Sequence, residues 1–388
     1  MKKWLHGSVV LAEEELFSAI RGKRIAAMIN GTAIHNDGRN LIDVIQESKT
    51  AVIDFLLGME HGVRCDKGAG EHDIGSVDKK TGIPIVDLYD YPERRPPISE
   101  LRRVDAVVYC AQDAGVRHWT FTPWMFYLMD SAAEAGCEVI VVDRPNPIGG
   151  ELIEGNLVKE KYLDTLLSGF GYPLRHGMTS GELALMYKNE RGLDLKLTVL
   201  RMNGWERSMF YSDTGLMWVP PTINIPTPES FLDFATVGLL QSSNLSLGDR
   251  TNLPFKFIGR PEFDGERLAD ELNSLGLDDV YFVPRFYMAS TRWEKDVLLP
   301  CQGVITVIPA KKKYRPIRAG LCLIDTISRL YPDAVDLEYK PSWARRRMGT
   351  DDIYDMINNR ESVMKLIPKW EGDSLEFERR RKPYLLYG

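Results

Sequence analysis

The sequence predicts an α/β protein with a Rossmann-like N-terminal domain, built on a mainly parallel sheet, and a smaller α+β C-terminal domain. Four short apolar runs in the first half each end in polar and turn residues: 24–28, 51–58, 104–110 and 139–142. Helical patterns lie between these runs, and this alternation is typical of βαβ units. The chain has 388 residues, which exceeds one ordinary hydrophobic core and indicates two domains.

The N-terminal half alternates helix and strand signals in order. The expected elements are a helix at 13–22, a strand at 24–28, a helix at 40–49, a strand at 51–58, a short strand at 81–89, a strand at 104–110, a helix at 122–135 and a strand at 137–142. Thr122 and Pro123 are residues that favour the start of a helix, and Gly136 is a residue that favours its end.

The second half begins with a capping box, in which Thr179 precedes Glu182 by three residues and opens a helix at 183–190. A strand at 195–202 follows, and the proline-rich stretch 218–228 is the expected crossing between domains 1–222 and 223–388. The elements expected beyond it are strands at 281–283 and 304–308 and helices at 318–330 and 351–359.

Composition excludes several classes of partner. The net charge of −6 opposes nucleic-acid binding, which requires a basic face. No stretch approaches the roughly 20 apolar residues of a membrane span, so we expect no membrane insertion. The five cysteines form no C-x-x-C pair, which predicts reduced thiols and no metal site. Residues 1–12 are too weakly apolar for a secretory signal, so we expect a cytoplasmic protein, or an exported one if a leader was removed.

The first strand is not followed by a nucleotide-binding turn. That position reads Asn30-Gly31-Thr32, without the G-x-G-x-x-G pattern, and no P-loop pattern occurs elsewhere. We therefore expect no cofactor, and a nucleotide-dependent enzyme is the disfavoured alternative.

Carboxylates gather instead at the expected strand ends: Glu60, Asp113 and Asp143, with Glu71 in a neighbouring loop. Glycoside hydrolysis typically uses one carboxylic acid to protonate the leaving oxygen and a second group as base or nucleophile. A glutamate at the end of an apolar strand is partly desolvated, which raises the pKa of a carboxyl group and favours the role of acid for Glu60. A salt bridge to Arg64, or a helix cap, is the equally weighted alternative for this glutamate.

Three further groups of residues fit a sugar site, each with a structural alternative. His61 could orient a sugar, although a lone histidine is more often structural. Arg117, with the aromatic residues that follow it, could hold a sugar ring or belong to the core. Asp143 and Arg144 could brace the cleft or bind an anionic group of the substrate bidentately.

Read in order, the chain resembles the NamZ-type exo-β-N-acetylmuramidases. The segments that carry the resemblance are Glu60-His61-Gly62-Val63-Arg64, Ala69-Gly70-Glu71, Thr81-Gly82-Ile83-Pro84, Gln112-Asp113, Asp143-Arg144-Pro145-Asn146-Pro147, Arg175-His176-Gly177-Met178-Thr179, Gly204-Trp205, Asn224-Ile225-Pro226-Thr227 and Pro254-Phe255. The resemblance implies a Rossmann-like domain, a smaller C-terminal domain and a cleft between them. It also implies exo-hydrolysis of β-1,4-linked N-acetylmuramic acid from the non-reducing ends of peptidoglycan fragments.

The family's proposed catalytic glutamate falls on Glu60, and Asp113 or Glu71 is the expected second carboxylate. Because the substrate carries a 2-acetamido group, substrate assistance is an open alternative to a second carboxylate. The expected substrate-binding residues are Asn30, His61, Arg64, Gln112, Arg117, Asp143, Arg144, His176, Asn224 and Arg250. The expected partner is a muropeptide or another amino sugar.

The chain departs from the family pattern at several expected site positions: Met59 replaces a proline, Cys110 an aspartate, Trp119 and Phe121 two tyrosines, and Leu247 a glutamate. These departures motivate a second hypothesis, a non-catalytic sugar-binding or regulatory relative that keeps the cleft. The sequence leaves the oligomeric state and the stereochemical course open.

Overall fold

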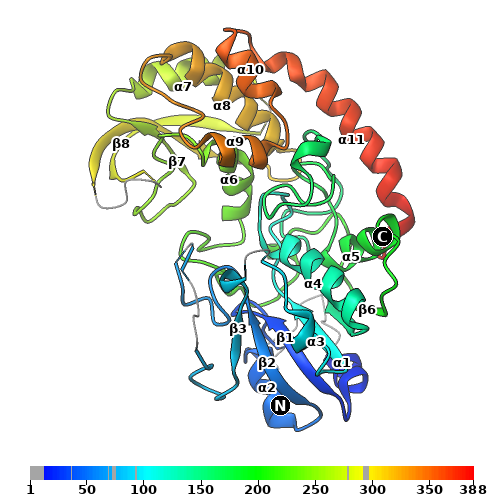
Figure 1. Ribbon diagram of the computed structural model, residues 1–388. Helices are drawn as coiled ribbons and strands as arrows, with labels where there is room; N and C mark the ends of the chain where they lie inside the picture. The colour runs from blue at the N-terminus through cyan, green and yellow to red at the C-terminus, as the bar shows by residue number, and fades with distance from the viewer. Residues whose placement is uncertain are drawn as a thin grey trace.

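The fold was analysed in a computed structural model that describes residues 13–35, 37–68, 70–71, 76–91, 94–277, 279–291 and 297–388. The N-terminal segment considered as a secretion signal, and Ala69 of the family pattern, lie outside these ranges. Figure 1 shows a lower part, built on the N-terminal strands, and an upper part that carries a second sheet.

A six-stranded parallel sheet organises the N-terminal part, in the order β3-β2-β1-β4-β5-β6. Its strands are β1 (Arg24–Ile29), β2 (Val52–Gly58), β3 (Ile85–Asp87), β4 (Ala106–Cys110), β5 (Glu138–Val142) and β6 (Leu197–Leu200). This is the Rossmann order, in which the order of the strands reverses between β1 and β4, and ligands bind in this fold at the carboxyl ends of the strands flanking that point.

Helices cover both faces of this sheet because its central strands are apolar on both sides. They are α1 (Glu13–Ile20), α2 (Leu41–Ser48), α3 (Ile98–Leu101), α4 (Phe121–Ala135) and α5 (Ser180–Glu190). Apolar side chains of α1 and α2 share a core cluster with Ala106 and Val108 of β4. Those of α4 and α5 share the other cluster with Val107 and Tyr109 of the same strand.

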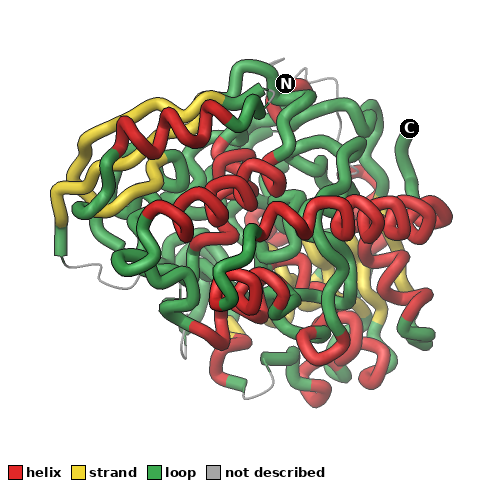
Figure 2. Tube along the Cα trace, turned by 90° about the horizontal axis from the view of Figure 1, so that it is seen from above, coloured by secondary structure: helices red, strands yellow, loops and turns green. Residues whose placement is uncertain are grey.

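The C-terminal part contains an antiparallel sheet, ordered β7-β9-β8, and the helices from α6 onward. Figure 2 shows the strands of this sheet in yellow at the left, with a helix packed against them. Its elements are α6 (Ser230–Val237), β7 (Phe257–Arg260), α7 (Gly265–Ser274), β8 (Tyr281–Ala289), β9 (Leu299–Val307), α8 (Pro316–Leu330), α9 (Pro341–Met348), α10 (Asp352–Asn358) and α11 (Ile367–Arg381). Short 3-10 helices are found at Leu88–Asp90, Glu160–Tyr162, Tyr211–Asp213, Gly238–Leu240, Val363–Leu366 and Lys382–Tyr384.

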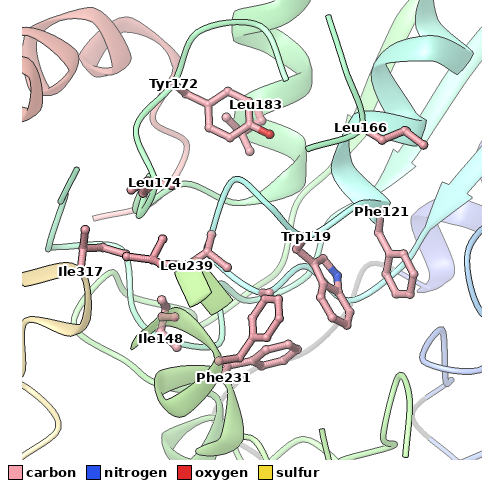
Figure 3. Packing of buried hydrophobic residues seen from close by; sticks show 14 of the residues in the cluster. Trp119, Phe121, Ile148, Leu166, Tyr172, Leu174, Leu183, Phe231, Leu239 and Ile317 are labelled. Carbon is pink, nitrogen blue, oxygen red and sulfur yellow. The ribbon is translucent and has the colours of Figure 1, made fainter. Parts of the chain in front are cut away.

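The two parts share one hydrophobic core. The Trp119 ring lies 5.4 Å from that of Phe231 on α6, and both belong to one cluster with Leu239, Ile148 and Ile317, which Figure 3 labels. Helix α11 then returns along the N-terminal part, where buried Arg381 donates to the carbonyl oxygens of Gly150 and Gly177. The expected division at residue 222 stays a prediction.

Most helix-boundary predictions are confirmed. Thr179 and Glu182 form the capping box, and Gly136 ends α4 with a φ of +71°. The start of α4 was predicted wrongly, because the helix begins at Phe121 and the hydroxyl of Thr122 donates to Asp113. Among the described residues, none of the helices combines the length and apolar character that crossing a membrane requires.

Candidate active site

The expected site residues of the N-terminal part follow the carboxyl ends of neighbouring strands. Asn30 follows β1, Glu60 follows β2, Gln112 follows β4 and Arg144 follows β5. Adjacent strands in a sheet are about 4.8 Å apart, so these ends lie along one edge of the sheet. The reversal between β1 and β4 falls within this edge, where open α/β sheets bind their ligands.

A strained turn presents Glu60. His61 has a φ of +69° and Gly62 a φ of +74°, and a histidine in this left-handed region is strained. The His61 Nδ1 atom contacts the Lys67 carbonyl oxygen at 3.2 Å, which closes the loop. The end of β1 packs directly against this turn, because a Cβ on Gly31 would lie 2.7 Å from the carbonyl oxygen of Arg64. The position of Glu60 is therefore set by backbone contacts.

Glu60 and Glu71 belong to the same loop. Glu60 is partly buried, and its Oε1 accepts a hydrogen bond of 3.0 Å from the amide of Gly70. Glu71 is exposed and accepts a hydrogen bond of 2.7 Å from the amide of Gly68. Because Gly70 directly precedes Glu71, the loop holds both carboxylates in one neighbourhood.

Arg64 does not pair with Glu60. It donates to Asp78, from Nε at 2.9 Å and from Nη2 at 2.6 Å, and to Asp43 from Nη2 at 2.8 Å. Burial raises the pKa of Asp78, but hydrogen bonds from Arg64 and Thr81 outweigh it and lower the pKa to about 2. The guanidinium thus clamps the loop to α2. This corrects the expected substrate contact and removes the ion-pair alternative for Glu60.

Asp113 is a structural carboxylate, against the expectation that it is catalytic. It is 3% exposed, and its oxygens accept hydrogen bonds from the Gly115 amide at 2.7 Å and the Thr122 hydroxyl at 2.6 Å. The buried His176 receives the Met178 amide on Nδ1, so its Nε2 carries the proton and faces Asp113 Oδ2 at 3.2 Å. Asp113 and His176 therefore fix the loop after β4, and internal hydrogen bonds occupy both carboxylate oxygens of Asp113.

Arg117 is also structural. Its guanidinium is fully buried and donates to the carbonyl oxygens of Asn156, Tyr172 and Met348 at 2.7–2.8 Å. Burial lowers its pKa to about 9. Since Met348 belongs to α9, Arg117 joins the two parts of the molecule instead of holding an acetamido or lactyl group.

Asp143 is the third correction, since its buried carboxylate does not pair with the Arg144 side chain. It accepts hydrogen bonds from the Arg144 and Gly181 amides and from the hydroxyls of Thr179 and Tyr387. Burial raises its pKa to about 6 against the opposing effect of these bonds. Asp143 therefore anchors the C-terminus of the chain to the sheet.

Gln112 and Arg144 lie together beneath the sheet edge. Arg144 Nε donates to Gln112 Oε1 at 3.3 Å, and the Gln112 amide nitrogen donates to the carbonyl oxygen of Pro145 at 2.8 Å. The Gln112 main-chain amide donates to the Thr32 hydroxyl, which ties the ends of β4 and β1. Burial lowers the pKa of Arg144, while Cys110 and the Tyr211 hydroxyl raise it above its usual value.

Two further expected contacts, Asn224 and Arg250, lie beyond β6 in the chain. Asn224 is partly exposed, and the structure records a contact of its main-chain amide with the Thr222 hydroxyl at 3.4 Å. Arg250 is exposed, with a φ of +61°. Their substrate-binding roles stay predictions.

A cavity of about 500 Å³ lies elsewhere, between segment 151–155, α8 and α11. Its apolar lining includes Ile317, Leu321 and Trp370, with Arg315 and Arg318 at one side. None of the expected site residues lines it. Within the described ranges, no cluster of three or more histidine, cysteine or acidic residues is arranged to hold a metal ion, and all five cysteines are free thiols.

Comparison with known proteins identifies the family. The model for the N-terminal region of exo-β-N-acetylmuramidase NamZ matches residues 25–229, and the model for its C-terminal region matches residues 232–387. The chain belongs to the NamZ family. The peptidoglycan β-N-acetylmuramidase NamZ of Bacillus subtilis (strain 168) is 35% identical over 370 residues, which are 95% of this chain and 88% of that protein.

Two solved structures share the fold. A DUF1343 family protein from Bacteroides fragilis NCTC 9343 superposes with a TM-score of 0.88 at 32% identity. A second protein of that family and organism has a TM-score of 0.77 at 27% identity. Each alignment covers 98% of this chain and 99% of the other chain. The predicted combination of a Rossmann-like parallel sheet and a smaller α+β part is confirmed.

Most departures from the family pattern are accommodated in the packed interior. Leu247 is 3% exposed within the main hydrophobic cluster, and Trp119 packs edge-on against Phe121 and Phe231. Cys110 differs from these, because its sulfur lies 4.0 Å from Nη1 of Arg144. Tyr211, which also contacts Arg144, is a site-edge residue that sequence reasoning missed, since no motif surrounds it.

Proposed function

We propose that the protein is an exo-acting glycosidase of the NamZ type, which removes β-1,4-linked N-acetylmuramic acid from the non-reducing ends of peptidoglycan fragments. The observation that supports this proposal is the position of Glu60 after strand β2. It lies at the sheet edge that binds ligands in this fold, on a strained turn, and Arg64 is committed to other carboxylates.

Glu60 would act as the general acid that protonates the leaving glycosidic oxygen. The amide of Gly70 occupies one of its oxygens, and the carboxyl group is otherwise available to the substrate. The second group would be Glu71, held in the same loop, or the 2-acetamido group of the substrate itself. Asp113 is omitted from the mechanism because its oxygens are occupied in the interior.

The function is tested by incubating the protein with an N-acetylmuramoyl-β-1,4-N-acetylglucosamine disaccharide and following release of free N-acetylmuramic acid. We expect cleavage by the wild type, while its Glu60→Gln variant should be strongly impaired. Binding without cleavage by the wild type would support the non-catalytic alternative instead. The matching disaccharide with N-acetylglucosamine at its non-reducing end is the control substrate and should be cleaved much more slowly.

We propose cytoplasmic recycling of muramoyl fragments as the setting of this reaction. Fractionation of cells that express the native gene, followed by immunodetection, tests it. Recovery of the protein outside the cytoplasm would contradict this part of the proposal.

A further inference from the structure

Arg144 is a buried cation without a carboxylate partner. The residue is 3% exposed, and its side chain contacts the Gln112 side-chain oxygen, the Tyr211 hydroxyl and the Cys110 sulfur. Among the residues that the structure describes, none supplies a carboxylate oxygen within 4.0 Å of the Arg144 guanidinium nitrogens; from Arg144, the Asp143 carboxylate accepts a hydrogen bond from the main-chain amide only. Buried charges in proteins are normally paired, because removing a charge from water is costly. This guanidinium therefore lacks the partner that its environment requires.

A second donor near this place is also unsatisfied. Asn30 is fully buried, and its Oδ1 accepts hydrogen bonds from the amide and the hydroxyl of Thr32. Its side-chain nitrogen, Nδ2, has no hydrogen-bond partner within the described part of the chain. Buried polar groups without partners are rare and call for an explanation.

The two donors come from strands on either side of β4. Asn30 directly follows Ile29, which pairs with Cys110 at the end of β4. Nη1 of Arg144 lies 4.0 Å from the sulfur of the same Cys110. The two residues are also linked through Gln112, whose side-chain oxygen accepts from Arg144 and whose main-chain amide donates to the Thr32 hydroxyl, which donates to Asn30 Oδ1. Both residues thus follow strands that flank β4, at the edge where the sheet reverses its strand order.

We propose that Arg144 and Asn30 form a subsite for a carboxylate of the substrate. This inference rests on the proposed function, under which that carboxylate is the lactyl group on the 3-oxygen of N-acetylmuramic acid. A guanidinium binds carboxylates through a planar fork of N–H donors, and the Asn30 amide adds one more donor. The lactyl group is also what distinguishes N-acetylmuramic acid from N-acetylglucosamine. Arg144 is then the residue that determines specificity.

The test measures binding of three sugars by titration calorimetry: free N-acetylmuramic acid, its uncharged lactyl amide and N-acetylglucosamine. A charge-assisted hydrogen bond contributes about 1.5–3 kcal/mol, which corresponds to at least about a tenfold preference for the acid over the amide. Arg144→Gln should reduce this preference to within about twofold while retaining the weaker binding of the amide. Arg318→Gln, an exposed arginine at the distant cavity, is the matched control and should keep the full preference.

Cys110→Asp provides an independent variant, since it places a carboxylate of the chain beside Nη1. We expect this variant to lose the preference for the acid and to melt at a temperature no lower than the wild type, because the buried charge gains a partner. Equal binding of acid and amide by the wild type would overturn the inference. So would full retention of the preference by folded Arg144→Gln or Cys110→Asp.

The two proposals can fail separately. If the wild type does not release N-acetylmuramic acid from the disaccharide, the proposed function fails, while the ratio of acid to amide binding is still measurable. If the disaccharide is cleaved but the acid is not preferred, only the carboxylate subsite fails.

Discussion

Replacing Glu60 with glutamine tests the chemistry at the lip of β2. Glutamine keeps the size of the side chain and an oxygen that can still accept the Gly70 amide, so the free energy of unfolding should change by less than about 1 kcal/mol. It cannot donate a proton to the leaving oxygen. General acid catalysis typically contributes about 10²–10⁴-fold, so kcat/KM on the muramoyl disaccharide should fall by that factor, or about 3–5 kcal/mol in activation free energy.

The assay compares two substrates that differ in their need for a proton. The sugar alkoxide that leaves from the disaccharide is a poor leaving group and requires protonation, whereas nitrophenolate leaves from a chromogenic muramoyl substrate without it. We therefore expect a large loss on the disaccharide and a loss of about tenfold or less on the chromogenic substrate. Equal losses on both would identify Glu60 as a nucleophile or base. Wild-type rates on both would refute its participation.

Three further predictions concern the residues around this glutamate. Gly31→Ala should place a methyl group against the Arg64 carbonyl, and so lower the free energy of unfolding by about 1–3 kcal/mol and reduce kcat/KM. Denaturant unfolding and steady-state kinetics measure the two effects, and unchanged values would contradict the close packing of β1 on the turn. Asp78→Asn should cost about 2 kcal/mol at pH 7. The depressed pKa of Asp78 stabilises the fold above pH 3.8, and this contribution is lost as the pH falls toward about 2, so the two proteins should converge there in urea unfolding. Asp113→Asn should lower the unfolding free energy by about 1–3 kcal/mol and reduce kcat less than Glu60→Gln does; the reverse order would restore Asp113 to the mechanism.

The parallel sheet could be predicted from the sequence because its strands carry two sequence signals. Each central strand is a short, continuous apolar run, as expected where helices cover both faces. Each run also ends in turn-forming residues. The C-terminal part was predicted less completely: helices α6, α7, α9 and α11 and strand β7 were missed, and β8 and β9 are longer than predicted. Strand β7 has only four residues and gains its stability from pairing with β9, which is distant in sequence.

The candidate site was predicted in part, because a polar residue at a strand end can point into the crevice or back into the fold. All four residues, Glu60, Asp113, Asp143 and Arg144, come shortly after the end of a strand. The carboxylate oxygens of Asp113 and Asp143, however, accept internal hydrogen bonds. The donors of these hydrogen bonds, such as Thr122 and Tyr387, come from other elements of the chain. Nothing in the local spacing reveals these hydrogen-bond partners, so only the folded molecule distinguishes Asp113 and Asp143 from the other two residues.

The most direct test of the account is a crystal structure of Glu60→Gln with the uncleaved muramoyl disaccharide bound. We predict that the amide of residue 60 lies within about 3 Å of the glycosidic oxygen. The control is that crystals of the wild-type protein in the same form cleave the disaccharide. If they do, and the glycosidic oxygen in the variant complex lies out of reach of residue 60, the assignment of Glu60 as the acid is contradicted.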